Sequence, residues 1–172
     1  MRTSFTLDQE IAIVAGGSYF DLHNNFDFVG FEYCPTERCA RLQWARGEGD
    51  WVSRDLPKSL TLRFHGVSNF AVRRRDHDLP FTEDSCVASI GFLPPEFSED
   101  YAAICPDYRS DDEHLSIQFQ SGLGVKLWAE TATHEIDPAG PPAPTPSALS
   151  KVAGPALSLP NGPPIRPADE RR

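Results

Sequence analysis

No apolar run in this 172-residue sequence approaches the length of a membrane span. The apolar stretch Ile11–Ala15 is far too short, because a helix needs about 20 residues to cross a bilayer. Asp8 and Glu10 interrupt the region after Met1 where an amino-terminal targeting segment would lie. No Asn-x-Ser/Thr glycosylation site occurs. We therefore expect a cytoplasmic protein that has no membrane partner.

Signatures of catalysis are also missing. The sequence has no Gly-x-Ser-x-Gly elbow, no phosphate-binding glycine loop and no His-Glu-x-x-His pair. Each of these patterns would have indicated a nucleophile, a nucleotide or a catalytic metal. We therefore expect a non-enzymatic protein without a cofactor.

Cysteine is scarce, and its four positions are Cys34, Cys39, Cys86 and Cys105. In a cytoplasmic protein most cysteines are reduced. Cys34 and Cys39 are weak candidates for a metal site, because a structural zinc ion needs four ligands and usually takes two such pairs. The pair is compatible with free thiols, with a cross-strand disulfide, or with zinc if His65 or His114 is brought to it by the tertiary structure.

Charge of one sign dominates the first part of the chain. Residues 1–137 contain 12 Lys and Arg against 23 Asp and Glu, a net charge of −11. Such a domain repels phosphate backbones, which argues against nucleic acid as a partner. The same charge accelerates association with a basic protein. Residues 138–172 carry +2 and 10 of the 16 prolines without any aromatic residue, so we expect a disordered tail after a single domain, 1–137.

Alternation of apolar and polar residues predicts a mainly β fold. The segments 27–34 and 39–46 form a hairpin if Cys34 faces Cys39, which places Glu32 opposite Arg41, Phe31 opposite Leu42 and Val29 opposite Trp44. Further strands are expected at 59–65, 70–73 and 87–93, and a last hairpin pairs Phe119 with Val125. Helix is restricted to 98–105 and, as an alternative to a strand, to 7–15. The expected architecture is an antiparallel meander or half-barrel of about seven strands with one or two short helices.

Acids interleaved with aromatic residues form our predicted interface. Carboxylates attract a basic partner and aromatic side chains anchor it. A solvated loop is the alternative interpretation of the same segment. The predicted interface comprises Glu96, Phe97, Glu99, Asp100, Tyr101, Asp107, Tyr108, Asp111, Asp112 and Glu113.

A pocket is the alternative location of function, as in a small-molecule binder or a small enzyme. An Asp21-oriented His23 would supply a general base, and neighbouring arginines would hold an anion. His77-Asp78 has the order of a metal-binding dyad but lacks further ligands. A third possibility is a structural subunit of a larger assembly. The alternative pocket comprises Asp21, His23, His65, Arg73, Arg74 and Arg75.

Two strand patterns, residues 60–67 (LTLRFHGV) and 114–119 (HLSIQF), resemble those of small bacterial immunity proteins and of uncharacterised bacterial β-rich domains of similar size. The resemblance extends over about residues 19–136. It implies an acidic, non-catalytic inhibitor that binds a toxin.

Overall fold

The computed structural model describes residues 1–94 and 113–137. These residues are mainly strands, which confirms the predicted β-rich class, and they include one short 3₁₀ helix, η1 (Phe81–Asp84). The strands are β1 (Arg2–Thr3), β2 (Thr6–Asp8), β3 (Ala12–Ala15), β4 (Ser18–Asp21), β5 (Phe26–Cys34), β6 (Cys39–Arg46), β7 (Ser59–His65), β8 (Asn69–Arg73), β9 (Val87–Leu93), β10 (His114–Phe119), β11 (Gly124–Trp128) and β12 (Thr131–Asp137).

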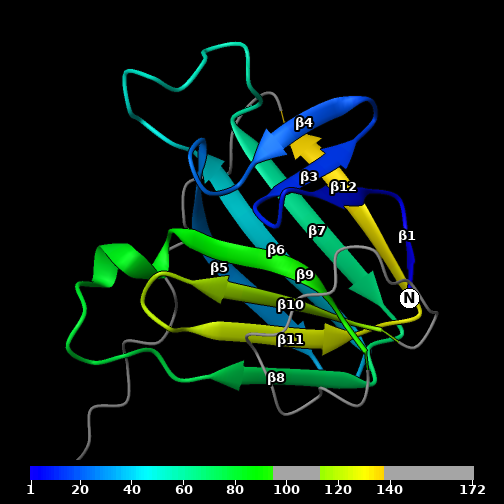
Figure 1. Ribbon diagram of the computed structural model, residues 1–172. Coiled ribbons are helices and arrows are strands. Elements are labelled where there is room, and N and C mark those ends of the chain that lie inside the picture. The colour runs from blue at the N-terminus through cyan, green and yellow to red at the C-terminus, as the bar shows by residue number, and fades with distance from the viewer. Residues whose placement is uncertain (95–112, 138–172) are drawn as a thin grey trace, which may run out of the picture. The chain divides into compact units, whose positions relative to one another are not determined.

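A five-stranded sheet runs in the order β1-β12-β7-β6-β5 (Figure 1). The β5-β6-β7 part is an antiparallel meander, and β12 returns from far along the chain to pair with β7 along its whole length, from Thr131↔His65 to Asp137↔Ser59. The short β1 pairs with β12 in parallel. The first and last described strands are therefore neighbours.

A second, four-stranded antiparallel sheet runs in the order β8-β11-β10-β9 and lies across the first (Figure 1). Alternate residues of both sheets form one buried cluster, in which Trp44, Leu62 and Phe64 from the first sheet join Ile117 and Leu127 from the second. This sandwich arrangement follows from the period of two, because each strand turns one face inward. At one side of the sandwich, the edge strand of the first sheet is β5 and the edge strand of the second sheet is β8.

The amino-terminal segment is β-structure rather than helix. Strands β2, β3 and β4 form a third sheet, in which β3 is central. Gln9 and Glu10 connect β2 to β3 with positive φ angles of 51° and 59°, so the helical alternative for 7–15 is wrong. Ile13 and Phe20 are buried and attach this sheet to the common core.

A bulge in β5 changes the predicted hairpin register. The pairs Cys34↔Cys39, Glu32↔Arg41 and Phe31↔Leu42 are confirmed. Beyond them Trp44 pairs with Phe28 instead of Val29, because Val29 is inserted between Phe28 and Gly30. Gly30 has a φ of 154°, which glycine adopts without strain.

The predicted pairing of the last hairpin is also wrong. Ile117 pairs with Val125 and Leu115 with Leu127, a shift of two residues that keeps every side chain on its expected face. The tighter turn is possible because Gly122 takes a φ of 78°. The strands at 59–65 and 70–73 do not pair with each other, because the chain crosses at Gly66 from the first sheet to the second.

The chain divides by its contacts into Met1–Pro141 and Pro142–Arg172. The predicted tail, 138–172, and the predicted helix, 98–105, lie outside the described residues. Within the described ranges no helix is long and apolar enough to span a membrane.

Candidate functional site: an exposed aromatic groove

Large apolar side chains gather where the edges of the two sheets meet. Phe31 and Tyr33 of β5 both contact Phe70 of β8, with ring centroids 5.3 Å and 4.7 Å apart, and Tyr33 stacks on Phe70 at 13°. The exposed fractions of Phe31, Tyr33 and Val72 are 40%, 39% and 44%. The second sheet therefore covers only the inner parts of Phe31 and Tyr33. With Val29 and Phe81, these residues form what we call the aromatic groove: Val29, Phe31, Tyr33, Phe70, Val72 and Phe81.

The β5 bulge opens a hollow at one end of the aromatic groove. The hollow has a volume of about 430 Å³ and lies between the bulge, η1 and the β10–β11 turn. Val29 and Phe81 are 60% and 79% exposed. Beside the hollow the Phe28 N–H donates to Ser85 O at 2.8 Å, which fixes the loop after η1 against the edge of β5. The hollow is lined by Phe28, Val29, Gly30, Phe31, Phe81, Asp84, Ser85 and Leu123.

Arg75 holds η1 in place at the groove. Its Nε donates to Asp84 Oδ1 at 2.8 Å, and its guanidinium carbon lies 4.3 Å from the centre of the Phe81 ring. Burial alone would raise the pKa of Asp84, but hydrogen bonds from Arg75 and Ser121 and the charge of Arg75 hold that pKa below its ordinary value. The exposed Phe81 ring is therefore positioned by a cation and an ion pair rather than by apolar packing.

The residues of the alternative pocket lie apart. Asp21 Oδ1 accepts from the backbone N–H groups of His23 and Asn24 at 3.0 and 2.9 Å, so it closes a turn and does not orient the His23 ring. His65 ends β7 and is exposed. Neither the hollow beside the groove nor a second one at residues 45–58 includes any predicted pocket residue. The predicted constellation for general base catalysis is not assembled.

The three arginines have separate environments. Arg73 Nε donates to Gly122 O at 2.9 Å, Arg75 binds Asp84, and Arg74 is exposed. They do not converge on an anion. The neighbouring Asp76, His77 and Asp78 cluster is fully at the surface, with the His77 side chain 92% exposed.

A thiol and an imidazole meet at a place that the sequence did not indicate. Cys86 Sγ lies 3.7 Å from His23 Nδ1, but the same nitrogen lies 2.6 Å from Val87 O, to which it must donate. Burial and the negative charges of Glu83 and Asp27 raise the pKa of Cys86. The imidazole nitrogen nearest the thiol is therefore a donor rather than a base, and the thiol is not activated, so the pair does not fit a nucleophilic site.

The predicted acidic interface lies outside the described residues except for Glu113. Glu113 is 2% exposed, whereas we expected an exposed acid. On the outer face of the second sheet Ser116 pairs directly with Lys126, and both are at most 2% exposed. Because the segment 95–112 lies outside the described residues, its assignment as an interface stays a prediction.

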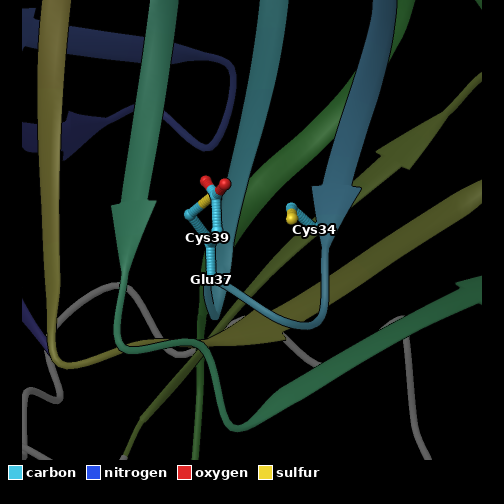
Figure 2. Close-up of side chains that lie close together, drawn as sticks. All are labelled: Cys34, Glu37 and Cys39. Atoms are coloured by element: carbon cyan, nitrogen blue, oxygen red, sulfur yellow. The ribbon is translucent and has the colours of Figure 1, made fainter.

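A cluster of metal-ligand types occupies the β5–β6 turn. Cys34 and Cys39 are thiols rather than a disulfide, and Glu37 lies between them in the turn. Figure 2 shows Cys34 at the end of β5 and Cys39 at the start of β6. Their ligand atoms and a Glu37 carboxylate oxygen all lie within 4.8 Å of one another. Burial, with the neighbouring Cys34 and Glu37, raises the pKa of Cys39.

No protein-family model, no curated protein and no solved structure matches this chain, so a function can be proposed from its structure alone.

Proposed function

We propose that this chain is a non-enzymatic protein-binding domain that holds an extended, basic segment of a partner protein in its aromatic groove. The single observation behind the proposal is a connected set of exposed apolar side chains: Phe31 and Tyr33 contact Phe70, and Phe31 lines one hollow with Val29 and Phe81, which are 60% and 79% exposed. Apolar patches of this kind mark interaction sites on proteins that are otherwise polar outside.

The chemistry of the groove favours a particular occupant. An extended segment places alternate side chains on one side, which suits a surface built along one edge strand. The hollow of about 430 Å³ takes one large apolar side chain from the segment. A net charge of −9 for the chain favours lysine and arginine in the flanks of that segment.

Selection from a random peptide library on the immobilised full chain tests the proposal. We expect peptides with apolar residues at alternate positions and flanking basic residues. Their affinity, measured by fluorescence anisotropy, should fall by about tenfold or more in Phe31→Ser or Phe81→Ser, as for truncated interface anchors. Trp51→Ser is the matched control, because Trp51 is 77% exposed and lies elsewhere, with its Nε1 donating to Asn24 O.

Two results would count against this function. The first is that no peptide is enriched, and the second is that binding is equally strong in the groove variants. If sedimentation instead gives a dimer that Phe31→Ser dissociates, the occupant is a second copy of the chain and the basic segment is wrong.

A further inference from the structure

The tip of the β5–β6 hairpin carries a second assembly of side chains, independent of the aromatic groove. Cys34 and Cys39 are direct partners across the hairpin, and the turn of four residues between them includes Glu37. Two cysteines separated by four residues fall within the spacing of zinc-binding pairs. The sequence offered His65 or His114 as further ligands, and the structure places Glu37 beside the pair and His65 on the neighbouring strand.

Glu37 is the third ligand. One of its carboxylate oxygens lies 3.7 Å from Cys39 Sγ, and all three ligand atoms lie within 4.8 Å of one another. Bonds of roughly 2.0–2.3 Å in a tetrahedral zinc site set ligand atoms about 3.3–3.8 Å apart. Small side-chain rotations therefore bring the three atoms to bonding positions around one ion.

A candidate fourth ligand, His65, lies on the neighbouring strand. Cys39 pairs with His65 of β7, just as it pairs with Cys34 on its other side. Directly opposed residues point to the same face, with Cβ atoms roughly 4.5–5.5 Å apart. His65 is exposed, so its ring is free of the constraints of the core. Sheet register thus aligns Cys34, Cys39 and His65 in one row on the outer face of the first sheet.

Nearby cations are directed elsewhere. The Arg38 guanidinium donates to Gly66 O and to Glu130 Oε1, at 3.1 and 3.3 Å. Arg41 pairs with Glu32 at 3.4 Å. Neither arginine neutralises Glu37 by any contact found among the described residues, so negative charge at the tip is available to a bound cation.

We propose that Cys34, Glu37, Cys39 and His65 bind one Zn²⁺ ion in a tetrahedral site. Thiolate and imidazole ligands prefer Zn²⁺ to hard cations such as Mg²⁺ and Ca²⁺. Binding releases the two thiol protons to solvent and leaves every oxidation state unchanged. The ion joins β5, β6 and β7 at one end of the sheet. Solvent exposure of Glu37 and His65 gives it direct access.

Titration of the reduced, chelator-treated full chain with Co²⁺ tests the site, because Co²⁺ takes the place of zinc and reports its ligands by absorption. We expect one ion per chain, with thiolate-to-cobalt charge-transfer bands and visible bands typical of a tetrahedral ion, and displacement of these bands by Zn²⁺. Native mass spectrometry should give one Zn²⁺ per chain.

Variants assign the ligands. Cys34→Ser, Cys39→Ser and His65→Ala should each weaken Zn²⁺ binding by more than the roughly 10–100-fold that loss of an outer-shell partner causes. Cys86→Ser and His77→Ala are matched controls, because they change the same residue types away from the hairpin tip. Far-ultraviolet circular dichroism of the metal-free variants verifies that each is folded.

Three results would overturn the site: no cobalt bands with the reduced wild-type chain, unchanged bands in the Cys34→Ser/Cys39→Ser double variant, or loss of bands in Cys86→Ser alone. A chain that forms a Cys34–Cys39 disulfide in air but binds no metal when reduced would also exclude it. None of these measurements involves a peptide, so they succeed or fail independently of the proposed function.

Discussion

Among the described residues, His114 is a histidine whose protonation state depends on folding. It begins β10, where its Nδ1 is buried and has no hydrogen-bond partner among the described residues. Burial lowers its pKa below the ordinary value of 6.5, and the positive charges of Lys126 and of the Met1 amino group lower it further. The folded chain therefore favours the neutral imidazole.

We predict that this preference makes the protein less stable as the pH falls below about 6.5. The unfolded chain binds the proton first, so the free energy of unfolding is constant above that pH and decreases as the pH falls toward the lowered pKa of the folded state. Urea unfolding at about pH 7.5 and pH 5.5, above the range in which most carboxylates titrate, measures the slope. His114→Gln should flatten it.

The control for this prediction is His77→Gln, because the His77 side chain is 92% exposed. That variant should keep the slope of the wild-type chain. A slope that survives in His114→Gln would assign the pH dependence to another group.

The exposure of single side chains is hard to predict from sequence, as Val29, Phe31 and Tyr33 show. The pairing of Phe31 with Leu42 was predicted correctly, and Tyr33 lies on the same face two residues along β5. The alternation could not predict that the second sheet ends at β8 and covers them only in part. Apolar character determines where a side chain is stable, whereas exposure depends on how far a neighbouring sheet extends.

At the scale of elements, β12 is the longest strand that the sequence did not indicate. One of its three inward positions, His134 between Ala132 and Ile136, is a histidine, so the apolar pattern of this strand is weak. Nevertheless it pairs with the whole length of β7 and also with β1. Long-range pairing, rather than local pattern, makes this segment a strand.

We predict that β12 is essential for folding and that the residues after it are not. A chain ending at Asp137 should retain the near-ultraviolet circular dichroism and unfolding midpoint of the full chain. A chain ending at Glu130 should lose its cooperative thermal transition, because β7 then lacks its ladder partner and the core loses Ala132. If the two truncated chains unfold alike, the role assigned to β12 is wrong.

Hairpins were predictable where their turns were regular. The four-residue turn after Cys34 determined the register up to Phe31, and the confirmed Glu32–Arg41 pair lies 3.4 Å apart. The bulge at Val29 and the tight turn at Gly122 each depend on one glycine with positive φ, and neither position breaks the alternation in the sequence.

The hollow of the aromatic groove depends on the bulge at Val29, so the candidate site could not be predicted. Of the proposed zinc ligands, the sequence indicated the two cysteines and, as one of two histidine options, His65, whereas the closeness of Glu37 to Cys39 depends on the geometry of the turn.

For the whole molecule, net charge is the property that the sequence defines most directly. The chain carries −9, and the segment 95–112 holds six acids and one arginine. A field of this sign raises the rate of encounter with a basic partner more than it raises final affinity. The resemblance to toxin-binding immunity proteins implies such a partner and stays a prediction.

We predict that Asp111→Lys with Asp112→Lys slows the association of a basic, groove-binding peptide severalfold at low salt. The effect should shrink at about 0.15 M salt, where exposed charges are screened beyond roughly 8 Å. Stopped-flow fluorescence gives the rate constants. Asp169→Lys with Glu170→Lys is the control, because it changes the net charge equally within the predicted tail. Equal slowing by both pairs would mean that total charge, and not the acidic segment, governs encounter.

The pairing of β1 with β12 has a consequence for biosynthesis. A growing polypeptide emerges amino terminus first, so β1 waits for its partner until residues 131–137 have been made. Throughout that interval one edge of β7 is also open to pairing with other nascent chains. The five-stranded sheet therefore closes only after residues 131–137 have emerged, and until then β1 and one edge of β7 lack their ladder partner.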